Sequence, residues 1–124
     1  MPYELNWKDN GCIIILTGNS SIEEINKSNG EIQGDYRFDT HKYQIWNHLD
    51  ADLSAIISDE ASIPASIDSI AAKYVPGIKV ALVIQEKNAV NFANYYIEKS
   101  KEFGSTWEVK LFDNMENTVQ WVYV

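Results

Sequence analysis

Two apolar runs constrain the fold of this chain more than any other feature. Residues 12–16 read CIIIL, and residues 78–84 read IKVALVI. A strand that is apolar on both faces must be covered on both sides, which is typical of the inner strands of a sheet flanked by helices. With 124 residues, the chain has the size of one domain and can bury roughly two-thirds of the surface that it exposes when unfolded. We therefore expect a single domain over residues 1–124, with these two runs as inner strands.

The first residues predict a β-hairpin. Polar and apolar side chains alternate from Glu4 to Lys8, as they do in a half-buried strand. Asp9, Asn10 and Gly11 separate this segment from the first apolar run, and Asn-Gly in such a place favours a tight turn because both residues tolerate a positive φ. The sheet should therefore begin with an antiparallel pair.

Strand-like and helix-like segments alternate through the rest of the chain. After Ser20 and Ser21, either of which can cap a helix, apolar residues take helical spacing as far as Gly34. We expect further strands at 43–49, 78–84 and 107–111, and helices from residues 58, 88 and 113. Strands that alternate with helices pair in parallel through right-handed crossovers, but their order in the sheet stays open. The predicted fold class is α/β, a mixed sheet with an N-terminal hairpin, flanked by about four helices.

Two of these helices carry further expectations. In the helix that begins at Ser58, Pro64 predicts a kink or a break, and Ile67, Ile70 and Tyr74 continue its apolar face. In the last helix, Asp113 and Glu116 have the spacing of a capping box.

The last helix is apolar on more than one side. Its expected buried face is Met115, Val119 and Val122, and Trp121 and Tyr123 extend the apolar surface. A helix that is apolar all round is either buried or in contact with a partner. Trp121 and Tyr123 therefore predict either the interface of a homodimer or a terminal helix packed over its own sheet.

The composition limits the classes of partner. A formal net charge of −8 repels nucleic-acid phosphates and anionic lipid head groups. The longest apolar run is far shorter than the roughly 20 residues that span a bilayer, so no stable membrane insertion is expected, and no signal peptide is visible. The single cysteine, Cys12, allows neither an internal disulfide nor a cysteine-based zinc site. We expect a cytoplasmic protein whose partner is another protein or a small apolar molecule.

Four segments together resemble a known family. They are YELNW at 3–7, DYRF at 35–38 before KYQI, PGIKVALV at 76–83 and WEVKLFD at 107–113. In this order and spacing, the chain resembles the SpoIIAA-like family of small bacterial proteins related to the STAS domain, over essentially its whole length. The resemblance implies a mixed sheet flanked by helices, a regulatory or binding role and no known catalysis. Because the STAS fold is similar to that of Sec14-type lipid-binding domains, it also implies an alternative, a soluble carrier of a lipid or another small molecule.

The resemblance implies a regulatory position as well. Many STAS domains are phosphorylated on a serine at the start of the helix that follows the third strand, and the counterparts here are Ser58 and then Ser54. Neither serine is followed by the glycine of the STAS pattern. Asp59 and Glu60 would also repel a phosphate on Ser58. The alternative role for Ser58 is that of a helix N-cap.

His48, Asp50 and Asp52 are the strongest polar grouping. They lie at the carboxyl end of the third predicted strand, at the edge where open α/β sheets bind ligands. A histidine with two carboxylates can act as acid and base, which gives a second alternative, a small hydrolase or isomerase. The other histidine, His41, lies roughly 23 Å away at the opposite end of the strand, so the two cannot share a metal. The alternative is a solvated loop whose acids cap the next helix.

We therefore predict no catalytic residue, no metal and no cofactor. The sequence contains no GxGxxG, no P-loop, no GxSxG and no Cys-His pair. The ligand-binding or regulatory edge is predicted at His48, Asp50, Asp52, Ser54 and Ser58. A further polar trio, Asp35, Arg37 and Asp39 around Phe38, is interpreted as local ion pairing beside a core residue.

Overall fold

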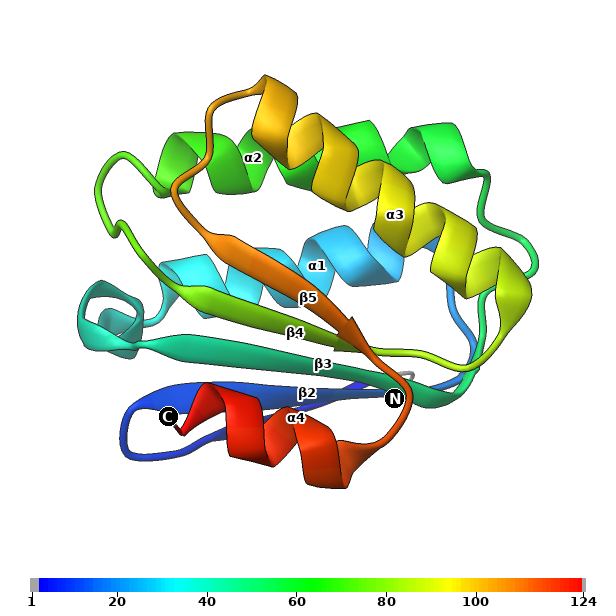
Figure 1. Cartoon of the computed structure of the whole chain (residues 1–124), viewed down its shortest axis with the longest axis horizontal. Helices are drawn as coiled ribbons and strands as arrows, with labels where there is room; N and C mark the ends of the chain where they lie inside the picture. The colour runs from blue at the N-terminus through cyan, green and yellow to red at the C-terminus, as the bar shows by residue number, and fades with distance from the viewer. Residues whose placement is uncertain (1–2, 124) are drawn as a thin grey trace.

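The computed structural model describes residues 3–123 and contains one five-stranded sheet (Figure 1). The strands lie in the order β1-β2-β3-β4-β5; β1 and β2 are antiparallel, and the later neighbours are parallel. Their bounds are Tyr3–Trp7, Gly11–Asn19, Tyr43–Asp52, Lys79–Val83 and Glu108–Phe112. The predicted α/β class, with its N-terminal hairpin and mixed sheet, is confirmed, and the strand order that the sequence left open is sequential.

Helices cover both faces of this sheet. Within residues 3–123 they are α1 (Ile22–Gly34), α2 (Ser62–Ala71), α3 (Lys87–Glu102) and α4 (Met115–Val122), with 3-10 helices η1 (Tyr36–Thr40) and η2 (Ser58–Ala61). Right-handed crossovers between successive parallel strands place their helices on one face. Figure 1 accordingly shows α1, α2 and α3 together on one side of the sheet and α4 on the other. None of the helices described is long and apolar enough to cross a membrane.

Side chains of the strands contribute to two hydrophobic cores. Ile14, Trp46 and Val80 belong to the larger core beneath α1–α3. Ile45 and Ala81, each next to one of these residues in sequence, belong to the smaller core beneath α4. Burying such a side chain fully contributes about 1.5–3 kcal/mol. The predicted inner strands are apolar on both faces because each face supports its own core.

The hairpin forms as predicted, but its turn is of a different kind. The Lys8 N–H donates to the Gly11 carbonyl at 2.7 Å. The residues with a positive φ within 3–123 are Gly18, Gly77 and Gly104, so Asn10 and Gly11 do not use the conformation that was expected of them. Gly11 serves close packing instead, because a Cβ atom there would lie 2.5 Å from the Tyr43 carbonyl oxygen.

The prediction for the helix that contains Pro64 was partly wrong. The break falls earlier, where η2 passes into α2, and Pro64 lies in the first turn of α2, where its missing N–H costs nothing. Ile67 and Ile70 do not form a buried face, since 40% and 57% of their surfaces are exposed. The residues that α2 buries are Pro64, Ala65, Asp68 and Ser69.

The last helix packs over its own sheet. Its N-cap is Asn114 and not Asp113, and the Asn114 side chain accepts a hydrogen bond from the Asn117 N–H at 2.8 Å. Trp121 is half-buried against Phe112, with 5.5 Å between the ring centroids. Tyr123 is 61% exposed. The homodimer interface at Trp121 and Tyr123 stays a prediction.

The polar trio after α1 is local, as expected. Asp35 and Arg37 form an ion pair at 2.8 Å, and the hydrogen bonds from Arg37 lower the pKa of Asp35 to about 2. The Arg37 guanidinium also lies over the Trp7 ring, 4.8 Å from its centroid. Phe38 is buried in the larger core.

Candidate functional site

A small cavity lies between the sheet and the layer of helices α1–α3. Its volume is about 30 Å³, which is room for one or two water molecules. Every residue that lines it is buried. Most of the lining is apolar or aromatic: Ile25, Trp46, Pro64, Val80, Leu82, Phe92 and Tyr96; the polar members are Asn29, His48 and Asp68. In this cavity two titratable groups, His48 and Asp68, meet apolar and aromatic walls.

Asp68 forms one end of the cavity. Its Oδ1 accepts hydrogen bonds from Asn29 Nδ2 at 2.8 Å and from Gln33 Nε2 at 2.9 Å, and its Oδ2 accepts one from the Tyr96 hydroxyl. Asn29 and Gln33 come from α1 and Tyr96 comes from α3, so one carboxylate joins the three helices. Burial raises the pKa of Asp68 to about 6, although the three hydrogen bonds pull it downward. Within residues 3–123, no ion pair involves Asp68.

His48 forms the other end, at an irregularity in the sheet. Ile15 pairs with Asn47 and Thr17 pairs with Asp50, so β3 has one residue more than β2 at this point. The Leu49 N–H donates to Asn47 Oδ1 at 3.0 Å, which satisfies a donor that the irregular register would otherwise leave free. Such irregularities reorient side chains and recur beside functional sites.

The His48 imidazole is neutral at pH 7. Burial alone lowers its pKa to about 4. Its Nδ1 is buried and has no hydrogen-bond partner among residues 3–123. Because a buried polar atom without a partner is costly, this nitrogen is a candidate contact for a bound molecule.

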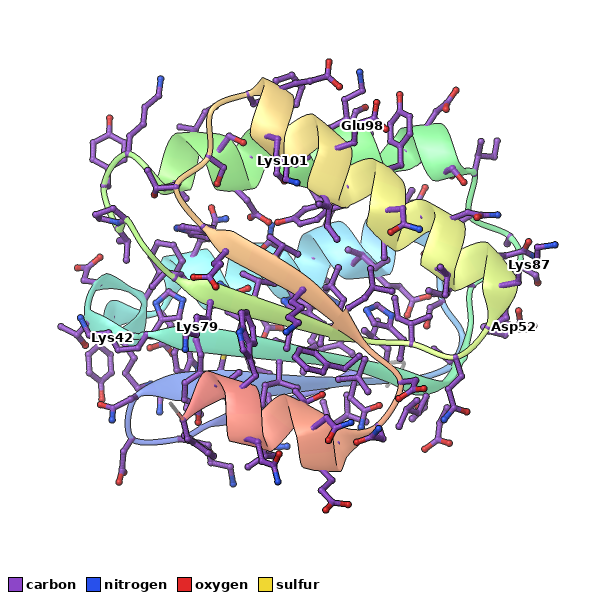
Figure 2. The ribbon with its side chains drawn as sticks, viewed as in Figure 1. Lys42, Asp52, Lys79, Lys87, Glu98 and Lys101 are labelled. Carbon is purple, nitrogen blue, oxygen red and sulfur yellow. The ribbon has the colours of Figure 1, made fainter. Side chains whose placement is uncertain are left out.

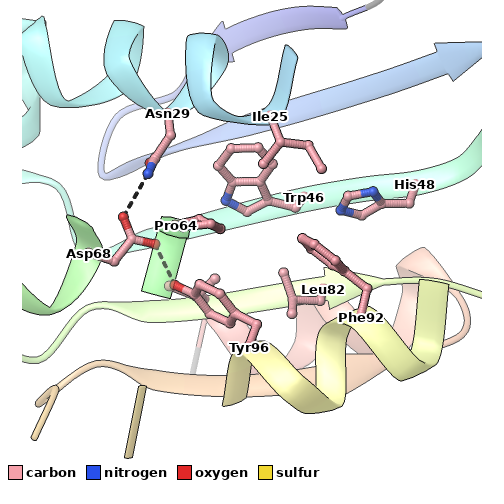
Figure 3. Close-up of a pocket in the computed structure, with 10 residues that line it drawn as sticks. Ile25, Asn29, Trp46, His48, Pro64, Asp68, Leu82, Phe92 and Tyr96 are labelled. Carbon is pink, nitrogen blue, oxygen red and sulfur yellow. Dashed lines mark hydrogen bonds between the residues drawn. The ribbon is translucent and has the colours of Figure 1, made fainter. Parts of the chain in front are cut away.

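Trp46 separates the two ends and is held by a chain of hydrogen bonds. Figure 3 shows Trp46 between His48 and the group of Asn29, Asp68 and Tyr96. The Trp46 indole N–H donates to Gln44 Oε1 at 3.0 Å, and Gln44 Nε2 lies 3.2 Å from His41 Nε2. This contact assigns the neutral tautomer of His41 with its proton on Nδ1, which donates to the Phe38 carbonyl. The chain fixes the large aromatic wall of the cavity.

The predicted edge residues do not gather around His48. His48 is buried, whereas Asp50 and Asp52 are exposed, and Figure 2 places Asp52 at the surface. Asp52 Oδ1 accepts the Ser54 N–H at 2.9 Å, and hydrogen bonding from the side chain and the backbone of Ser54 lowers the pKa of Asp52. No group of three or more His, Cys, Asp or Glu side chains in residues 3–123 could hold a metal ion.

The two candidate serines lie beyond this strand. Ser54 is exposed, and Ser58 is the first residue of η2. The N-cap position of η2 is Ile57, so Ser58 does not have the expected capping role. The Ile57 N–H donates to Glu60 Oε1 at 2.8 Å. A regulatory role of either serine stays a prediction.

Sequence reasoning identified His48 but missed Asp68, Asn29 and Tyr96. A signal for Asp68 was present. Ala61, Ala65 and Ala72 are buried, and Asp68 lies between them at helical spacing. Small residues on one side of a helix indicate close packing against a neighbour, so an acid in that row is a buried acid. The larger isoleucines on the outer side obscured this row.

No protein-family model matches this chain, and neither a curated protein nor a solved structure was found that matches it. The resemblance to the SpoIIAA-like family therefore stays a prediction. The cavity has apolar walls, a carboxylate at one end and a neutral imidazole at the other. This arrangement suits the binding of a small molecule with one or two polar groups.

Proposed function

We propose that this protein is a non-enzymatic regulatory or binding module that encloses a small, mostly apolar molecule between its sheet and helices α1–α3. The observation that carries this proposal is a pair of buried polar atoms in the cavity lining, His48 Nδ1 and Asn29 Oδ1, that have no hydrogen-bond partner in the described part of the chain. Native interiors leave few such atoms unsatisfied, and each one costs about 1–3 kcal/mol. A ligand that supplied the missing hydrogen bonds would recover that cost.

Helix α2 is the wall that must move to admit a ligand. The cavity of about 30 Å³ holds only one or two water molecules, so a larger molecule needs an outward shift of one wall. Among the residues described, every hydrogen bond from α2 to α1 or α3 ends at Asp68. One carboxylate therefore controls access.

The outer side of α2 supports a contact with a partner protein. Ile63, Ile67 and Ile70 lie on α2 at helical spacing, and Tyr74 continues the row in the turn that follows; they expose 46%, 40%, 57% and 83% of their surfaces. Exposed apolar rows of this kind are typical of interaction sites. Because Pro64 and Asp68 on the inner side of α2 line the cavity, a bound ligand that moved α2 would also move this row. Ligand binding in the cavity would in this way regulate the contact with the partner protein.

Native mass spectrometry beside denatured mass spectrometry tests the proposal. Gently purified protein should show a native mass above a multiple of the subunit mass, with the excess released on denaturation. Val80→Leu puts an extra methylene into the cavity and should abolish the excess. Val119→Leu, the same change at an exposed position on α4, should keep it.

The same proteins also define the outcomes that would contradict the proposal. If the wild type is free of ligand, and no small apolar compound raises its melting temperature more than that of Val80→Leu, the proposal fails. Turnover of a substrate that is lost in His48→Gln would favour the hydrolase or isomerase alternative.

A further inference from the structure

Within residues 3–123, no positively charged side chain forms an ion pair with Asp68 at its end of the cavity. A buried carboxylate is usually paired with a cation, because desolvation of an unpaired charge is expensive. Asp68 is 6% exposed and has only neutral donors, namely two side-chain amides and a phenol. Burial is the largest influence on the pKa of Asp68 and raises it. The hydrogen bonds to Asp68 are in place, but in the described part of the chain no cation is paired with it.

Two acceptors at this end remain open. An ionised carboxylate offers about four lone-pair sites, and three of those on Asp68 are used. Asn29 donates from its amide nitrogen to Asp68, while its Oδ1 is buried without a partner. The two open acceptors therefore belong to side chains in direct contact. A group that is all donor and no acceptor would satisfy both.

The walls around this end are aromatic. Trp46, Phe92 and Tyr96 line the same cavity and are each buried. The faces of such rings attract organic cations, by about 2 kcal/mol or more where the site is dry. Among residues 3–123, the cavity lining contains no Lys or Arg, and burial lowers the pKa of His48 to about 4, so an anion meets no positive side chain of the lining at pH 7.

We propose that the cavity selects a small primary amine, with its ammonium group on Asp68 and Asn29 and its apolar chain against Trp46, Phe92 and Leu82. This inference rests on the proposed function and adds the chemical class of the ligand. An ammonium has three donors and no acceptor, which matches the open acceptors, and it supplies the missing counter-charge. A carboxylate of the same length would meet Asp68 as a like charge.

A matched ligand series tests this selectivity. Butylamine, 1-butanol and butanoate have the same chain and differ in the charge of the head group. Each is titrated into ¹⁵N-labelled protein at pH 7.5, and the Asn29 side-chain amide and the Trp46 indole N–H are followed by NMR. Butylamine should bind at least about tenfold tighter than 1-butanol, and butanoate should not bind.

Two variants separate the buried carboxylate from net charge. Asp68→Asn should remove the preference for the amine, whereas Asp50→Asn, which changes the net charge equally at an exposed position, should keep it. If Asp68→Asn does not fold, the wild-type series alone decides. Equal affinity for 1-butanol, or tighter binding of butanoate, would overturn the selectivity and leave the binding module standing. If none of the three compounds shifts the Asn29 or the Trp46 signal, both the amine selectivity and the proposed binding module would be overturned.

Discussion

The buried polar groups at the two ends of the cavity differ in their hydrogen bonding and in the direction of their pKa shifts. At one end, Asp68 has three hydrogen-bond donors, and burial raises its pKa to about 6. At the other end, His48 Nδ1 has no partner, and burial lowers the pKa of the imidazole to about 4. In both cases burial favours the neutral form, which is the protonated acid for Asp68 and the deprotonated base for His48. One cavity therefore contains two large pH-dependent effects of opposite sign.

The two effects oppose each other when the pH falls. From pH 6.5 toward 4, the unfolded state binds a proton at His48 that the folded state resists, so folding stability decreases. From pH 6 toward 3.8, the folded state binds a proton at Asp68 before the unfolded state does, so folding stability increases. Each shift corresponds to about 3 kcal/mol. The free energy of unfolding of the wild type should therefore vary less with pH than either site alone would imply.

The largest expected effect comes from removing the wall between the two ends. Trp46→Ala should lower the free energy of unfolding by about 3–5 kcal/mol, because it leaves a large void in the main core and ends the hydrogen-bond chain through Gln44 and His41. Urea unfolding at pH 7 measures it. Trp121→Ala is the matched control on the other face, where the ring is only half-buried, and it should cost clearly less. Equal losses would contradict the central position of Trp46.

Much of this architecture follows from sequence patterns. The apolar runs predicted inner strands because their side chains must satisfy a core on each face, and the structure has both cores. The Ser21 cap of α1 follows from local chemistry, with the Glu24 N–H donating to Ser21 Oγ at 3.3 Å. Such features depend on neighbours in the chain, so the sequence determines them directly.

The cavity depends on contacts that the sequence does not place. Asn29, Asp68 and Tyr96 meet only because α1, α2 and α3 lie on the same face of the sheet. The orientation of α2 was misjudged because its bulkiest residues, such as Ile70, lie outside, while Ala65 lies inside. His48 was placed correctly at a strand end, but the extra residue in β3 that accompanies its burial leaves no mark in hydropathy.

Replacing His48 should expose the contribution of Asp68. His48→Gln keeps a polar side chain and removes the titration. Relative to the wild type, its free energy of unfolding should rise by about 3 kcal/mol as the pH falls from 7 to 4, because its unfolded state no longer gains stability from protonation at this position. Urea unfolding at several pH values measures this difference. The pKa of His41 is also lowered by burial, but that contribution is common to both proteins and cancels. A difference that does not change with pH would show that His48 is not buried in the neutral form.

Replacing Asp68 should change the pH dependence of the free energy of unfolding in the opposite direction. Asp68→Asn loses the gain from protonation of the folded state, so relative to the wild type its free energy of unfolding should fall by up to about 3 kcal/mol between pH 7 and pH 4. Asp50→Asn, at an exposed position, provides the control and should follow the wild type more closely. If both variants had the same slope, the raised pKa of Asp68 would be refuted, and with it the contrast between the ends.

The smallest effect is expected on the outer side of α2, although its residues are the most hydrophobic. Ile67→Lys and Ile70→Lys should each change the free energy of unfolding by no more than about 0.5 kcal/mol, because both side chains are already exposed to water. Ala65→Lys, on the inner side of the same helix, buries an unpaired charge and should unfold the domain at far lower urea concentration. A large loss at Ile67 or Ile70 would mean that α2 turns these residues toward the core in solution. Unchanged stability would mean that the apolar row does not support the fold and is free to contact a partner. Asp68 would then be the residue of α2 that holds the helix over the cavity.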